Sequence, residues 1–114
     1  TADRYSAQNF IVTEIGDTQW KFSIGSLSGI KTAASFSLDH DSQISLNASC
    51  NVSNGAFKLV LVDVENREVL AILCNNSNGS SPSSFDLPQG SYAIKAVGKK
   101  AAATGYFTIT ILKA

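Results

Sequence analysis

Residues 55–64, Gly-Ala-Phe-Lys-Leu-Val-Leu-Val-Asp-Val, constrain the fold of this chain more than any other stretch. Their apolar side chains divide between the two faces of a strand, with Phe57, Leu59 and Leu61 on one face and Val60, Val62 and Val64 on the other. A strand that is apolar on both faces belongs in the middle of a sheet that is covered on both sides. The polar residues 65–67 then predict a hairpin turn into residues 69–73, so this hairpin is the expected centre of the fold.

The rest of the chain shows the two-residue alternation of half-buried strands and no 3.6-residue period. Further strands are predicted at residues 10–15, 18–24, 34–38, 44–50, 83–87, 92–96 and 107–111. Residues 25–29 and 98–105 are predicted connections, and Asn54-Gly55 is a predicted turn. Strands spaced by roughly ten residues predict one all-β domain over residues 1–114. We expect an antiparallel β-sandwich of jelly-roll type with about eight strands, and a loose N-terminal arm at residues 1–8.

Composition excludes some partners. Lys plus Arg equals Asp plus Glu, nine of each, so the positive excess that drives nucleic-acid binding is missing. The longest apolar run is far shorter than the roughly 20 residues of a transmembrane helix. Only 16% of the residues are charged, and Ser, Thr and Asn carry most of the polarity, a bias common in exported bacterial β-proteins. Because the sequence starts at Thr1, we expect a processed or trimmed chain.

The C-terminal half resembles a known kind of secreted module. Residues 85–98 (FDLPQGSYAIKAVG) and 105–109 (GYFTI) resemble the ending of prepeptidase C-terminal-type domains and of small Gram-positive lipoproteins of unassigned role. Residues 59–69 (LVLVDVENREV) are similar to the central hairpin of those proteins. The resemblance implies a jelly-roll-like sandwich, secretion or attachment to the cell surface, and a non-catalytic accessory role. It transfers no functional residue, because those modules have no fixed catalytic motif.

Cys50 and Cys74 are the only cysteines. If their strands lie side by side, a disulfide would close about 25 residues and stabilise the fold by roughly 3 kcal/mol in the chain-entropy model. The alternative is a pair of buried free thiols acting as small apolar side chains. Export favours the disulfide. Two cysteines and one histidine do not supply a zinc ligand set.

The polar candidates do not form a catalytic motif. His40 lies in an Asp-His-Asp-Ser turn. A catalytic histidine needs a nucleophile and a group that orients its ring, and the sequence shows no such motif. The carboxylates Asp39, Asp41, Asp63 and Glu65 are candidate calcium ligands, although their spacing is not that of an EF-hand. The alternative is that they cap backbone N–H groups in turns. We therefore expect no enzyme activity and no cofactor, with calcium as the one alternative.

Three residues are candidates for a ligand-binding face. Tyr106 is opposite in phase to Phe107, which predicts an exposed aromatic ring, and Lys99 and Lys100 precede it in the same hairpin. The alternative for the lysines is a solvated hairpin tip. Trp20 has the same phase as Phe22 in the predicted strand 18–24, so we expect it in the core. Tyr92 follows a Pro-Gln-Gly turn, and we expect its hydroxyl to bond back to the backbone as in a tyrosine corner.

These observations predict a non-catalytic, exported interaction module that binds a carbohydrate, a peptide or a partner at the cell envelope. The alternative is a structural or folding-accessory domain of a larger secreted hydrolase. The second apolar face of the central hairpin (Val60, Val62, Val64, Leu70 and Ile72) must be covered by the second sheet, by the N-terminal arm or by another subunit, so a homo-oligomer is also possible.

Overall fold

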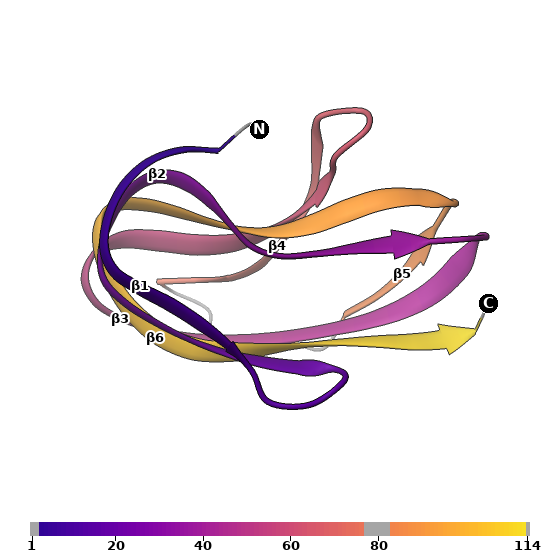
Figure 1. Ribbon diagram of the computed structural model, residues 1–114, viewed down its shortest axis with the longest axis horizontal. Helices are drawn as coiled ribbons and strands as arrows, with labels where there is room; N and C mark the ends of the chain where they lie inside the picture. The colour runs from indigo at the N-terminus through magenta and orange to yellow at the C-terminus, as the bar shows by residue number, and fades with distance from the viewer. Residues whose placement is uncertain (1–2, 77–82, 114) are drawn as a thin grey trace.

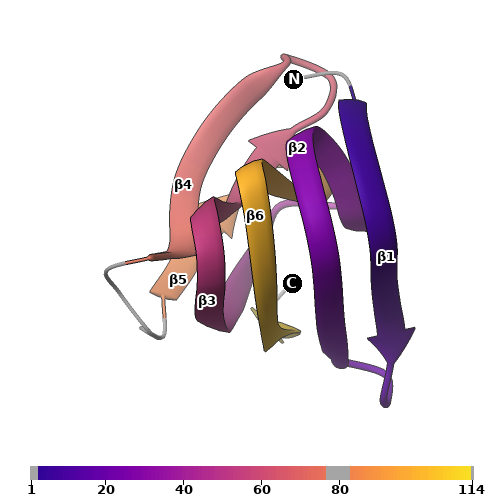
Figure 2. The same ribbon diagram turned by 90° about the vertical axis from the view of Figure 1, so that its left-hand side faces the viewer.

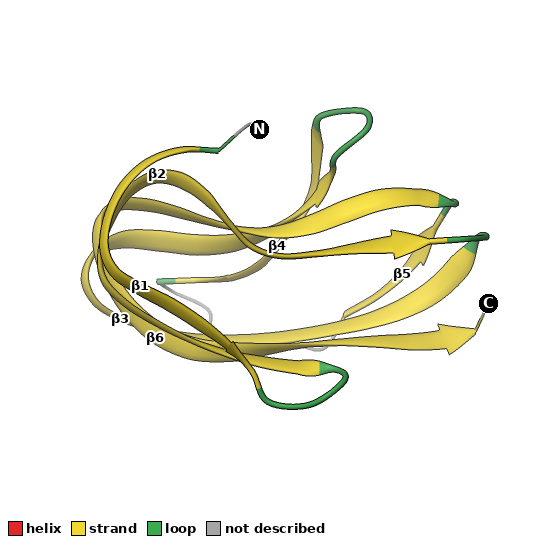
Figure 3. Ribbon diagram, in the orientation of Figure 1, coloured by secondary structure: helices red, strands yellow, loops and turns green. Residues whose placement is uncertain are grey.

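The computed structural model describes residues 3–76 and 83–113, and their regular structure consists of β-strands (Figure 3). The strands are β1 Arg4–Glu14, β2 Gln19–Leu38, β3 Ser42–Asp63, β4 Glu68–Asn75, β5 Ser83–Leu87 and β6 Gly90–Lys113. All pairings are antiparallel, in the order β1-β2-β6-β3-β4, with β5 also paired to β3. Viewed from the bent end, this order runs across the molecule with β4 and β1 at opposite edges (Figure 2).

Two layers arise because the long strands fold over. β1, β2, β3 and β6 each run along one layer, bend, and continue in the other (Figure 1). We call the upper layer the part built from residues 4–8, 28–38, 57–63, 68–75 and 90–97, and the lower layer the part built from residues 10–14, 19–24, 42–50, 83–87 and 104–113. β6 lies between β2 and β3, which are consecutive in the chain, so the strand order is that of a jelly-roll-like sandwich rather than a simple meander.

The bends have a local cause in the sequence. Register shifts interrupt the pairing of β2 with β6 at residues 24–29, and the pairing of β3 with β6 at residues 52–56. Gly29 and Gly55 adopt φ values of 111° and 68°, which glycine tolerates without a steric penalty. Lys100 is also left-handed, at φ 49°, and its N–H donates to Ser28 Oγ over 3.1 Å. These bulges bend the sheet sharply without ending its strands.

The all-β antiparallel sandwich is therefore confirmed, but the predicted number of strands is wrong. Residues 3–76 and 83–113 form six strands rather than about eight, because the segments predicted as connections are bends inside continuous strands. Residues 19–24 and 34–38 belong to β2, residues 44–50 and 55–63 to β3, and residues 92–96 and 107–111 to β6. The predicted central hairpin is present as β3 and β4, with Leu61 opposite Ala71.

The core fills the space between the two layers. Phe22, Leu46 and Phe107 from the lower layer and Leu59 and Ile94 from the upper layer are almost fully buried in one cluster. Trp20 packs against this cluster as expected, and its ring stacks on Phe107 with centroids 5.4 Å apart. Burial of side chains this large supplies the main favourable contribution to folding.

The described part of the predicted loose arm, residues 3–8, is not loose, whereas residues 1–2 lie outside the described residues. Residues 4–8 pair with β2, and the carboxylate of Asp3 accepts hydrogen bonds from the backbone N–H and the hydroxyl of Thr32. Asp3 also forms an ion pair of 2.9 Å with Lys95, whose side chain is 10% exposed. These contacts with Thr32 of β2 and Lys95 of β6 hold residue 3 against the sheet.

The second face of the central hairpin is only partly covered. Val60 and Val62 are buried, whereas Val64, Leu70 and Ile72 are exposed. Val64 lies in the turn after β3, and Leu70 and Ile72 lie in β4, which ends the strand order, whereas β3 lies between β6 and β4. A strand at an edge has no neighbour to cover its outer side chains.

Candidate functional site

Tyr106 lies at the centre of the outer face of the lower layer. Tyr106 pairs with Lys21 of β2 on one side and with Ser49 of β3 on the other. Directly opposed residues in a sheet point to the same face. The neighbouring pairs add polar side chains from the same three strands. We call the resulting surface the Tyr106 face: Gln19, Lys21, Ser23, Asn47, Ser49, Asn51, Thr104, Tyr106 and Thr108.

This face presents hydrogen-bonding groups that the described part of the chain does not use. Tyr106 is 40% exposed, and neither its hydroxyl nor the ammonium of Lys21 has a side-chain partner among residues 3–76 and 83–113. The carboxamide oxygen of Asn47 is buried without a hydrogen-bond partner. Buried polar atoms are nearly always paired, so an unpaired one is unusual. Within the described residues, the face therefore offers an exposed aromatic ring with an unpaired hydroxyl and one unpaired ammonium, whereas the buried oxygen of Asn47 is not itself accessible to a ligand.

The structure does not bring Lys99 and Lys100 together with Tyr106. Both lysines lie at the bend of β6, where Lys99 is opposite Ala56 of β3, whereas Tyr106 lies in the lower layer opposite Ser49. Lys100 has a structural role through its backbone, since its carbonyl accepts a hydrogen bond of 3.3 Å from the carboxamide of Asn54. The three candidates thus belong to two separate surfaces.

Tyr92 forms the predicted corner. Its ring is buried, and its hydroxyl donates to the backbone carbonyl of Pro88 over 2.7 Å. The ring also stacks with Phe36 at a centroid distance of 5.6 Å. Burial raises the pKa of the Tyr92 hydroxyl, and the negative charges of Asp63, Glu65 and Asp41 raise it further. These groups hold Tyr92 neutral as a structural donor.

The four calcium candidates are not assembled into a ligand set. Within residues 3–76 and 83–113, no group of three or more His, Cys, Asp or Glu side chains is placed to hold a metal ion. Asp41 instead accepts the backbone N–H of Gln89 over 2.9 Å. Asp63 accepts the carboxamide and the backbone N–H of Asn66, and these bonds, the carboxamide first, lower its pKa. Both carboxylates cap turns, which is the alternative that the sequence offered.

His40 lies in the exposed β2–β3 turn. Its backbone carbonyl, rather than its imidazole, is the group in use, because it accepts the hydroxyl of Ser42 over 2.9 Å. Its position gives no support to a catalytic role.

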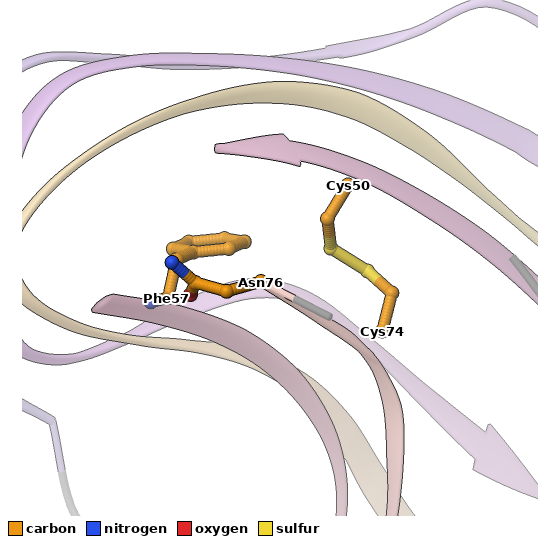
Figure 4. Close-up of a disulfide and its surroundings, with 4 residues drawn as sticks. All are labelled: Cys50, Phe57, Cys74 and Asn76. Carbon is orange, nitrogen blue, oxygen red and sulfur yellow. Dashed lines mark hydrogen bonds between the residues drawn. A yellow bond between two sulfur atoms is a disulfide. The ribbon is translucent and has the colours of Figure 1, made fainter. Parts of the chain in front are cut away.

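Cys50 and Cys74 form a disulfide that connects the layers (Figure 4). Their Cα atoms are 5.8 Å apart, an ordinary distance for a disulfide. Next to it, Asn76 accepts the backbone N–H of Phe57 over 2.7 Å and donates to the carbonyl of Gly55 over 3.0 Å. The end of β4 is thereby fixed to the bend of β3 by one covalent bond and two hydrogen bonds.

The sequence predicted Tyr106 but missed the residues around it. Lys21, Asn47, Ser49 and Thr108 each lie at an outward position of an alternating strand, so their exposure was readable from the pattern. What the pattern lacked was the position of β6 between β2 and β3, which brings these residues beside Tyr106.

None of the described residues forms a helix that is long and apolar enough to span a membrane.

Comparisons with known proteins give only a faint likeness. No family model matches the chain, and no curated protein matches it. Among solved structures, the chain is similar to a point mutant of a carbohydrate binding module of family 29, with a TM-score of 0.44 and 8% identity over 97% of this chain and 82% of that one. The chain is also similar to another point mutant, of the module CBM29-2 complexed with cellulohexaose. The TM-score is 0.40 and the sequence identity 11%, over 97% of this chain and 81% of that one. Values this low carry no argument about family or ligand, and the resemblance to prepeptidase C-terminal-type domains stays a prediction.

Proposed function

We propose that this protein is a non-catalytic carbohydrate-binding module whose ligand lies on the Tyr106 face. The observation that carries the proposal is the exposed Tyr106 ring, with its hydroxyl unused, among the side chains of Ser49, Asn47, Thr108 and Lys21. An aromatic ring stacks against the apolar C–H face of a pyranose. Hydroxyl and carboxamide groups both donate and accept hydrogen bonds, which matches the hydroxyls of a sugar.

The shape of the face favours a glycan chain. Three adjacent strands, β2, β6 and β3, present the polar side chains in one layer. Neighbouring strands are about 4.8 Å apart, so the face is roughly 10 Å wide, enough for a sugar ring and its hydroxyls. Enclosed small molecules prefer concave sites, whereas a chain can lie along an open sheet.

We also propose that the domain is exported. The Cys50–Cys74 disulfide supports this proposal because disulfides persist in oxidising compartments. The Ser- and Thr-rich composition and the family resemblance favour the same location, secreted or attached to the bacterial cell surface.

A second candidate function rests on a different surface. Val69, Leu70 and Ile72 of the edge strand β4 are 48%, 37% and 55% exposed. Exposed apolar residues on an unpaired edge favour contact with a protein. This observation supports the alternative of an accessory domain that docks on a larger hydrolase or on another subunit.

The test is a binding measurement with matched variants. Affinity electrophoresis in gels that contain neutral polysaccharides (mannan, cellulose derivatives, xylan) should retard the native protein. Tyr106→Ala should weaken the retardation about tenfold, in line with the loss of one stacking contact. Tyr5→Ala is the control, because Tyr5 is 49% exposed on the upper layer. Equal retardation of both variants would exclude the Tyr106 face as the site.

A further inference from the structure

The acidic residues of this neutral protein are concentrated away from the bends of its strands. Eight of the nine acidic residues lie in the turns or at the strand ends beside them. The turns themselves lie away from the bends (Figure 3). They are Glu14, Asp17, Asp39, Asp41, Asp63, Glu65, Glu68 and Asp86. Residues 20–38, 42–62 and 87–113, which include the bends of β2, β3 and β6, contain no acidic residue. The bent end therefore carries lysines without compensating carboxylates.

A pocket of about 320 Å³ lies at this bent end, between β3, β6 and the last residues of β4. Ala56, Phe57 and Val97 give it an apolar lining, and Lys58 and Lys99 are its charged residues. Asn76 also lines it, but its carboxamide is committed to the backbone of Phe57 and Gly55. Apart from Asn75, which also lines the pocket, the polar side chains left to meet a ligand are the two ammonium groups.

Neither ammonium is neutralised by a residue that the structure describes. Lys58 and Lys99 have no ion pair with any residue among 3–76 and 83–113. Residues 77–82, Ser-Asn-Gly-Ser-Ser-Pro, contain no acidic side chain either. Two unpaired positive charges beside an apolar surface are complementary to a negative group on an apolar body.

We propose that this pocket is a second binding site, separate from the Tyr106 face, for a small amphipathic anion: a carboxylate or sulfonate attached to an apolar chain or ring. The anionic group lies between Lys58 and Lys99, and the apolar part contacts Ala56 and Val97. The proposal does not rest on carbohydrate binding, because it uses other residues and another chemistry.

Hexanoate and the fluorescent aromatic sulfonate 8-anilinonaphthalene-1-sulfonate are suitable probes. The folded protein should bind the sulfonate saturably, hexanoate should displace it, and 1-hexanol, which has the same chain without the charge, should not. Lys58→Gln combined with Lys99→Gln should weaken binding at least fivefold, since each exposed charge pair contributes modestly. Arg67→Gln is the matched control, because it removes one positive charge from the exposed β3–β4 turn outside both proposed sites, and it should bind as the native protein does. Trp20 fluorescence verifies that each variant is folded.

Three results would overturn the proposal. Displacement by 1-hexanol as efficient as displacement by hexanoate would mean that the site does not select an anion. Unchanged binding by the double lysine variant would place the probe elsewhere. Self-association of the native protein at low salt, abolished in the double lysine variant, would identify the occupant as the acidic end of a second copy.

Discussion

The disulfide between Cys50 and Cys74 connects the two layers at the edge formed by β3 and β4. Cys50 pairs in register with Gly105 of the lower layer, and Cys74 pairs with Leu59 of the upper layer. The sandwich is otherwise one sheet folded over, with β1 continuous at the opposite edge. The bond therefore closes the side at which β3 is followed by the separate strands β4 and β5.

Replacing both cysteines by alanine should destabilise the protein by about 3 kcal/mol, because the disulfide closes a loop with a sequence separation of 24 residues. Urea denaturation of the native protein and of Cys50→Ala/Cys74→Ala would measure the difference. Reduction of the native protein should reproduce it. Equal denaturation midpoints in all three samples would contradict the role assigned to the bond.

Gly105→Ala should destabilise the protein by more than about 2 kcal/mol. A Cβ at this position would collide with the carbonyl oxygen of Ser49 and lie 2.8 Å from Cζ of Phe22. Gly16→Ala is the control, because a Cβ there meets no atom within 4 Å. Thermal unfolding of both variants would measure the difference, and similar melting temperatures would show that β3 and β6 can separate at little cost.

The alternating strands and Gly55 show which parts of the fold the sequence predicts and which it does not. The alternation of Phe107 with Tyr106 and of Leu59 with Val60 predicted strands, buried faces and an exposed tyrosine, since side-chain period is a local property. Gly55 was predicted as a turn, but it is a bulge inside β3. A left-handed residue fits both a turn and a bulge, and only the pairing with β6 decides between them. The position of β6 depends on contacts between distant residues, so the surroundings of Tyr106 were not predictable from local pattern.

Tyr92→Phe should lower stability by about 1 kcal/mol at neutral pH, through loss of the hydrogen bond to Pro88. The variant should also change how the free energy of unfolding declines at alkaline pH. The pKa of Tyr92 is raised in the folded state, so its contribution is complete below the unfolded pKa of about 10 and is lost as pH rises through the folded pKa. Denaturation from pH 8 to 11.5 should show a steeper decline for the native protein than for Tyr92→Phe. Parallel curves would refute the assignment.

Asp3→Asn should reduce the loss of folding stability at acidic pH. Burial raises the pKa of Asp3, but hydrogen bonds from the Thr32 N–H, Lys95 and the Thr32 hydroxyl outweigh it and hold that pKa below 3.8. The stabilisation is therefore present above pH 3.8 and is lost as pH falls through the lower folded pKa. Because Asp3 is partly exposed, we expect a change below about 1 kcal/mol at neutral pH. Denaturation of both proteins from pH 6 to 2 would measure it, and an identical acid limb would contradict this account.

The decisive test of carbohydrate binding on the Tyr106 face is an NMR titration of the uniformly ¹⁵N-labelled domain. The titrant is an oligosaccharide of the polysaccharide that retards the protein in the gel assay. We expect the largest saturable amide shifts at residues 19–23, 47–51 and 104–108, the three strand segments that form the Tyr106 face. The side-chain amide of Asn47 should shift with them. Shifts confined to the β4 edge or to the bent end, with residues 104–108 unchanged, would contradict the proposed carbohydrate site.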